Sequence, residues 1–313
     1  MVDASQLDAI QLNLSPVFQR VMSANILIMM FSVALSLKVD DFKQLRREPV
    51  AVLGGVVGQI LGLPLLTLLL VFLLQPHPGL ALGMIVVAAC PGGAISNVLT
   101  LLSRGDTAYS VSLTAVSSLL SAVVTPVSIL LWASLYPPTA GLLDELAISP
   151  LPFLSQMVTL LAIPIGVGMW VAHYHAERAA KIRKILTPLA LSGIAVLILV
   201  GLIGNFDLVI ETGAITLPLV VLHNSLALAF GFGLAWLLSF GAARRRALTF
   251  EIGIQNSGLG LLILLSHLGA PGGALTILAL WGIWHFFSGM AVMAVFRWLA
   301  GRSDTPGLQG PRP

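Results

Sequence analysis

Long runs of apolar residues constrain this chain more than any other feature. A membrane-spanning helix needs about 20 apolar residues, and charged, proline and glycine residues divide the chain into nine such runs. We therefore expect nine transmembrane helices, at 17–37, 49–74, 79–103, 107–136, 150–173, 185–204, 209–240, 246–267 and 273–299. Only 9% of the 313 residues are charged, whereas soluble domains carry about 25%. The composition thus excludes a water-soluble globule, and the lack of alternation within the runs argues against an outer-membrane barrel.

The two ends of the chain differ in composition from the apolar part. Residues 1–16 are too polar and too short to span a bilayer and lack the features of a signal peptide, so we expect a tail. Residues 301–313 are rich in Gly and Pro, which predicts a disordered tail. Residues 17–300 then form one transmembrane unit. The single cysteine, Cys90, excludes a disulfide scaffold.

Basic residues fall almost entirely on one predicted side of the membrane. If the nine helices alternate in direction, the odd-numbered connections and the C-terminal end carry fifteen of the sixteen Lys and Arg residues. Only Arg20 lies near the other face. The positive-inside rule then places the N-terminus outside and the C-terminus in the cytoplasm. The net charge of +3 therefore reflects topology and is not a sign of nucleic-acid binding.

Two predicted helices are interrupted near their middle by glycine and polar residues. Residues 90–97 read Cys-Pro-Gly-Gly-Ala-Ile-Ser-Asn, and residues 251–260 read Glu-Ile-Gly-Ile-Gln-Asn-Ser-Gly-Leu-Gly. Proline and glycine disfavour a continuous helix at both places. One such break in a membrane protein is usually only a kink, but two at corresponding positions indicate the binding site of a secondary transporter. Carbonyls freed at a break can bind a cation, and the N-terminus of the next half-helix attracts an anion.

The spacing of the breaks indicates an inverted repeat. They lie in the third and eighth segments, five apart, so that the fourth and ninth segments correspond and the second and seventh do too. Because five is odd, corresponding segments run in opposite directions, as an inverted repeat requires. The first helix of the first five-helix repeat would then be missing.

Glu251 is the acidic residue that the sequence places at one of these breaks. It could be an interfacial carboxylate, since Arg246 lies five residues away, but Gln255 and Asn256 continue the polarity inward. Lys and Arg occur only near the ends of the apolar segments, so none is placed to neutralise a carboxylate in their interior, which leaves a proton or a bound metal cation. Hydroxyl, amide and carbonyl oxygens with one carboxylate suit a hard ion such as sodium.

Other polar side chains lie inside the predicted helices. Ser110 and Thr114 are four residues apart on one helix face, where they either supply hydroxyl ligands or bond back to their own helix. For the remaining ones we expect interhelical hydrogen bonds: Gln59, His223, Asn224 and His285. As a donor, His285 could also meet an anionic ligand.

The two interrupted segments resemble the bile acid:sodium symporter family, including its bacterial members. Cys-Pro-Gly-Gly-x-x-Ser-Asn and Glu-x-Gly-x-Gln-Asn-Ser-Gly-Leu carry the resemblance, which extends from the first segment to about residue 300. It implies an all-α polytopic membrane protein whose core domain contains two crossing broken helices beside a separate panel domain. The panel would comprise about 17–48 and 150–204, and the core about 49–136 and 209–300. The missing first helix is also absent from animal members.

The resemblance also implies which residues bind ligands. One sodium site would use Ser96, Asn97, Ser110, Thr114 and Glu251. A second would use Gln59, Glu251 and Gln255 with backbone oxygens of Ile252 and Ile254. Substrate would lie near the crossing, by Ala94, Asn256 and His285. Some bacterial relatives have Thr in place of Ala94, so this chain lacks that hydroxyl.

The implied function is sodium-coupled symport of an organic anion, either bile acid-like or a small organic acid such as pantoate. Two Na⁺ would be the coupling ions, with no cofactor and no nucleic-acid partner, in a monomer surrounded by lipid in the bacterial inner membrane. A related carrier driven by protons, or one that works in efflux, is the alternative. An enzyme is not expected, because the chain has no His-Glu-x-x-His or Gly-x-Ser-x-Gly motif. A channel would need polar residues along the whole width of the membrane, whereas the polar residues of this chain are concentrated at two breaks.

Overall fold

Helices form the fold of the part of the chain that the structure describes. The computed structural model describes residues 16–37, 39–204 and 206–303, and no β-strand occurs among them. The elements in chain order are α2 (Pro16–Ala34), η1 (Val39–Phe42), α3 (Lys43–Arg47), α4 (Pro49–Val57), η2 (Gly58–Gly62), α5 (Leu63–Leu74), α6 (Pro78–Ala89), α7 (Ala94–Leu102), α8 (Thr107–Leu135), α9 (Pro137–Glu145), α10 (Pro150–Tyr174), α11 (Ala176–Gly204), α12 (Phe206–Leu237), α13 (Ala242–Gly253), α14 (Ser257–His267) and α15 (Gly272–Ser303). A helix satisfies its backbone groups within one segment, as an apolar environment requires.

The apolar segments predicted from the sequence coincide with these helices, and the all-helical class is confirmed. Among the described residues, five helices are long and apolar enough to cross a membrane: Pro49–Leu74, Thr107–Leu135, Pro150–Tyr174, Gly213–Leu237 and Gly272–Ala300. Shorter apolar helices occupy Arg20–Ala34, Pro78–Ala89 and Ser257–His267. The number of nine spans and the inverted repeat stay predictions.

The predicted ends of the transmembrane unit need one correction. The helix α15 continues to Ser303, so residues 301–303 are helical and do not belong to a disordered tail. The rest of that predicted tail, 304–313, and residues 1–15 of the predicted N-terminal tail lie outside the described residues. The short helix α9 was not predicted, and prolines at its first positions favour its start there.

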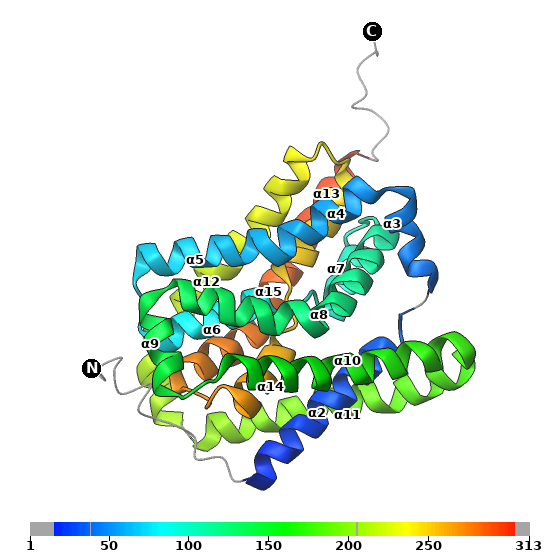
Figure 1. The fold of residues 1–313 in the computed structure, drawn as a ribbon. Coiled ribbons are helices and arrows are strands. Elements are labelled where there is room, and N and C mark those ends of the chain that lie inside the picture. The colour runs from blue at the N-terminus through cyan, green and yellow to red at the C-terminus, as the bar shows by residue number, and fades with distance from the viewer. Residues whose placement is uncertain (1–15, 38, 205, 304–313) are drawn as a thin grey trace.

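Three helices group together on one side of the molecule. The helix α2 packs against both α10 and α11, and these three lie side by side in Figure 1. The helices α8 and α14 contact this group, α8 through α10 and α14 through α2. On the other side, α15 packs against α6, α12 and α14, and α12 packs along α13.

The two polar interruptions break their helices and pair with each other. The chain is extended at Cys90 and Gly93 between α6 and α7, and at Ile254 between α13 and α14. The amide of Asn256 donates to the carbonyl of Pro91 (2.9 Å), and the amide of Gly93 donates to the carbonyl of Ile254 (3.2 Å). Each break therefore satisfies peptide groups of the other, which an apolar environment would otherwise leave unbonded.

Candidate functional site

Glu251 lies in the last turn of α13, beside this crossing, and its side chain is completely buried. Two serine hydroxyls donate to Oε1, from Ser96 on α7 and Ser110 on α8, each at 2.6 Å. The hydroxyl of Thr114, one turn further along α8, lies 3.0 Å from Oε1 and 2.9 Å from Oε2. Glu251 is thus not interfacial, and the two α8 hydroxyls point at it instead of bonding back to their own helix.

Asn97 connects these hydroxyls to one another. Its Nδ2 donates to the Thr114 hydroxyl (3.1 Å), and its Oδ1 accepts from the Ser110 hydroxyl (2.8 Å). The structure therefore brings together all five side chains that the family resemblance assigns to the first sodium site. Their oxygen atoms come from three helices, α7, α8 and α13, so the cluster depends on how those helices are placed.

Hydroxyl groups surround the carboxylate of Glu251. Its side-chain hydrogen bonds in the described part of the chain all come from Ser and Thr. A buried carboxylate without a partner costs several kcal/mol, and hydrogen bonds to a charged group return about 1.5–3 kcal/mol each. The described residues contain no group of three or more His, Cys, Asp or Glu side chains. This oxygen-rich donor set is of the kind that suits a hard cation.

A second group of oxygen atoms surrounds the backbone of the same turn. Gln59, in the π-helix η2, donates through Nε2 to the carbonyl of Glu251 (3.0 Å), and Gln255 donates through Nε2 to the carbonyl of Ile252 (2.7 Å). The Oε1 atoms of both glutamines are buried and have no hydrogen-bond partner among the residues that the structure describes. A buried unpaired oxygen costs about 1–3 kcal/mol. A bound cation would remove that penalty for either oxygen. The second sodium site, to which the backbone oxygens of Ile252 and Ile254 also belong, stays a prediction.

Gly92 lets the two groups approach each other. A Cβ atom at this position would lie 3.0 Å from Nε2 of Gln59 and 3.0 Å from Oε2 of Glu251. Such a distance is tighter than nine in ten real Cβ contacts, so the neighbouring side chain would have to move by a few tenths of an ångström. A side chain at this point of the break would therefore displace Gln59 or Glu251 from its position in this structure.

The three predicted substrate residues are only partly brought together. Ala94 and Asn256 begin the half-helices that leave the crossing, and Asn256 Oδ1 caps α14 by accepting from the amide of Leu259 (3.1 Å). His285 lies on α15, where Nδ1 contacts the carbonyl of Trp281 (2.7 Å). Its hydrogen bonds do not reach Ala94 or Asn256. Its Nε2 atom is buried and has no hydrogen-bond partner in residues 16–37, 39–204 and 206–303.

Two polar residues of α12 make the interhelical bonds expected of them. Nε2 of His223 lies 2.7 Å from the hydroxyl of Thr67 on α5. Asn224 donates to the carbonyl of Gly253 at the end of α13 (2.8 Å) and accepts from the hydroxyl of Ser288 (2.5 Å). Sequence reasoning did not connect Asn224 with the break; its depth in an apolar helix was the only available signal.

Comparison with known proteins shows the family of this chain. A family model described as the sodium bile acid symporter family matches residues 24–212. The chain belongs to this family. The predicted resemblance is confirmed, and the matched residues include the first break. Members of the sodium bile acid symporter family are transporters, so the chain is a protein of a sodium-dependent transporter family and not an enzyme.

Curated relatives of this family come from bacteria, plants and animals. The uncharacterized sodium-dependent transporter YocS of Bacillus subtilis is 35% identical over 262 residues, which cover 84% of this chain and 78% of the relative. The probable chloroplastic sodium/metabolite cotransporter BASS2 of rice is 33% identical over 78% of this chain and 56% of its own length. The human ileal sodium/bile acid cotransporter is 25% identical over 79% of this chain and 69% of its own length.

Proposed function

We propose that this chain is a sodium-coupled symporter that carries organic anions across the bacterial inner membrane by alternating access. One observation carries the proposal: within the described part of the chain, the fully buried carboxylate of Glu251 is held by hydroxyls alone and lies beside two buried amide oxygens without partners. Sodium is a cation that such oxygens bind. The names of the bacterial, plant and animal relatives support coupling to sodium.

Two sodium ions bind in this scheme, one in each oxygen group. The first takes oxygens from Ser96, Asn97, Ser110, Thr114 and Glu251. The second takes them from Gln59, Gln255, Glu251 and the carbonyls of Ile252 and Ile254. Two cations, one carboxylate and one monoanionic substrate sum to zero charge, which suits a site inside a membrane. Moving two cations with one anion is electrogenic, so a negative interior favours uptake.

The substrate binds at the crossing, where the N-termini of α7 and α14 meet. Both half-helices present the positive end of a helix dipole there, which attracts an anion. Asn256 supplies an amide and His285 a ring nitrogen without a partner, whereas Ala94 offers no hydroxyl. The substrate class is an organic acid, from bile acid-like molecules to a small acid such as pantoate.

Alternating access needs two parts of the protein that move relative to each other. The helices α2, α10 and α11 group together and form one of these parts. These helices belong to the panel at 17–48 and 150–204, and the broken helices belong to the core at 49–136 and 209–300. The packing of α2 on α10 and α11 supports this division. The chain crosses the membrane nine times as a monomer in lipid, with inverted repeats, its N-terminus outside and its C-terminus in the cytoplasm. Movement of the core against the panel then exposes the site to either side.

A thermal-shift screen of organic acids, each with sodium chloride or with choline chloride at fixed pH, tests this function. Ligands that bind the native state raise its melting temperature. We expect acids that stabilise the protein only with sodium, and uptake of the same acids into proteoliposomes only down a sodium gradient. Uptake that persists in choline and follows a pH gradient would instead establish the proton-driven alternative.

A further inference from the structure

Three consecutive arginines begin the helix that carries Glu251. Arg244, Arg245 and Arg246 lie in the first turns of α13, where the positive end of the helix dipole disfavours cations. The positive-inside rule explains why basic residues occur on this side, but it requires no particular partner for any of them. Two of the three bond to nearby backbone: Arg245 to the carbonyl of Phe240 (2.6 Å) and Arg246 to that of Ser103 (3.0 Å). Arg244 differs, because it pairs with side chains from two other helices.

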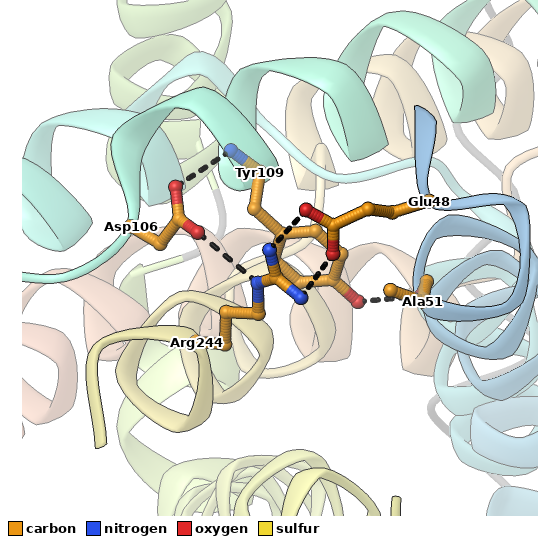
Figure 2. Close-up of polar contacts among 5 residues, drawn as sticks. All are labelled: Glu48, Ala51, Asp106, Tyr109 and Arg244. Carbon is orange, nitrogen blue, oxygen red and sulfur yellow. Dashed lines mark hydrogen bonds and ion pairs between the residues drawn. The ribbon is translucent and has the colours of Figure 1, made fainter. Parts of the chain in front are cut away.

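Arg244 lies between two carboxylates, as Figure 2 shows. Its Nη2 donates to Oε1 of Glu48 at 2.7 Å, and its Nη1 contacts the other oxygen of the same carboxylate. Its Nε donates to Oδ2 of Asp106 at 3.2 Å. The guanidinium also covers the ring of Tyr109, with its Cζ 5.6 Å from the ring centroid. One planar cation therefore fixes three chain segments in one geometry.

These contacts lie one to two helical turns before the residues of the first proposed sodium site, on the same helices. Arg244 precedes Glu251 by seven residues on α13, which is two helical turns or about 10.5 Å. Asp106 is the N-cap of α8 and precedes Ser110 by four residues, or one turn. The helices α8 and α13 are thus joined twice: by the ion pair between Arg244 and Asp106 near their N-termini, and further along by the hydrogen bonds from the α8 hydroxyls to Glu251. The position of the ion pair sets the distance between the α8 hydroxyls and Glu251.

The same cluster reaches the helix that leads to Gln59. Glu48 is the residue before α4, and α4 continues into η2, which contains Gln59. The hydroxyl of Tyr109 donates to the carbonyl of Ala51 in α4 at 2.9 Å, so α8 and α4 are joined a second time (Figure 2). Arg244 and its neighbours therefore connect three helices that carry proposed sodium ligands.

We propose that Arg244 is a positioning residue for sodium, holding α8 and α4 against α13 through Asp106 and Glu48 without touching the ion. The inference rests on the proposed function, because it assumes that the oxygen groups bind sodium. The side chains of Arg244 and Glu48 are 27% and 39% exposed, and exposed ion pairs add little to stability. The contribution of this cluster is therefore to geometry, and its loss weakens sodium binding more than it weakens the fold.

Two variants test this with no change to any proposed ligand. Arg244→Gln removes the cation, and Asp106→Asn removes one charge while keeping a good N-cap for α8. The measurement is the sodium concentration that gives half of the sodium-induced rise in melting temperature, in sodium and choline mixtures of constant ionic strength. We expect each variant to raise that concentration roughly 10-fold, the lower end of the range for residues that support metal ligands. The double variant should add little further, because both remove the same contact.

Arg245→Gln is the matched control, since it removes the same charge from the neighbouring position. Its sodium midpoint should equal that of the wild type. The inference is overturned if Arg244→Gln lowers the melting temperature in choline but leaves the sodium midpoint unchanged, or if Arg245→Gln shifts the midpoint equally. A wild-type protein that does not respond to sodium would overturn the proposed function together with this inference. A wild type that responds, with an Arg244→Gln variant that responds identically, overturns the inference alone.

Discussion

Replacing Glu251 with glutamine should abolish sodium binding while preserving the fold. Glutamine has nearly the same shape and keeps one oxygen, so the change removes the charge and little else. At about 4 Å and an effective dielectric constant of about 20, one charge contributes about 4 kcal/mol to holding an ion. Losing that contribution weakens binding roughly 1,000-fold. Because Glu251 belongs to both proposed sites, both ions should be affected.

The effect on stability can be calculated from ligand linkage. At a sodium concentration of about 100 times Kd, the wild type gains about 2.7 kcal/mol of unfolding free energy. A roughly 1,000-fold weaker site at the same concentration is nearly empty, and the gain falls below about 0.1 kcal/mol. In choline, Glu251→Gln should be at least as stable as the wild type. The serine and threonine hydroxyls around it can accept from the new amide as readily as they donate to the carboxylate.

Thermal unfolding of purified protein, titrated with sodium against choline, measures both the stability gained from sodium and the stability in choline. The wild type should show a melting temperature that rises with sodium, and Glu251→Gln a flat response from an equal or higher starting point. A variant that keeps a sodium-dependent rise of similar size would refute the reasoning, because the ion would then be held without the carboxylate. A variant unstable in choline would show that the carboxylate is needed for the fold.

Four further variants test other parts of the site. Gln59→Leu or Gln255→Leu removes an unpaired amide oxygen, so the Hill coefficient for sodium in transport should fall from about 2 towards about 1. Gly92→Ala places a Cβ 3.0 Å from the site's polar atoms, so the half-saturating sodium concentration in the thermal assay should rise. Gly141→Ala, with nothing within 4 Å, is its control. Asn224→Leu leaves the carbonyl at the end of α13 unpaired, so melting temperatures should fall with and without sodium, by an amount equivalent to about 1–3 kcal/mol.

Each of these variants has an outcome that contradicts its premise. A Hill coefficient that stays at the wild-type value in Gln59→Leu and in Gln255→Leu would remove the second ion from the scheme. Equal sodium responses of Gly92→Ala and Gly141→Ala would show that the break tolerates a side chain. If Asn224→Leu has the same melting temperatures as the wild type, the hydrogen bond from Asn224 to the carbonyl of Gly253 does not stabilise the break.

The positions of the breaks could be predicted because their residues act locally. Pro91 and the glycines beside it disfavour a continuous helix through their own backbone chemistry, and Glu251 is conspicuous in an apolar segment. The spacing of Ser110 and Thr114 likewise put both on one helix face. These signals depend on the residue itself or on helical periodicity, so they survive without knowledge of the fold.

Contacts between distant segments could not be predicted in the same way. Arg244 is one of three similar arginines, and its partners Glu48 and Asp106 lie in two other connections, so composition indicated only topology. The π-helix at Gly58–Gly62 looks like ordinary apolar helix in the sequence. The antiparallel bond pattern between Gly92 and Gln255 depends on how two breaks 163 residues apart meet in space. No local sequence pattern predicts that these two breaks pair with each other.

Equilibrium binding of radioactive sodium to the purified protein tests the central claim most directly. The account predicts saturable binding that approaches two ions per chain in the wild type and disappears in Glu251→Gln. Binding that does not saturate, or that is unchanged when the carboxylate is replaced, would contradict it.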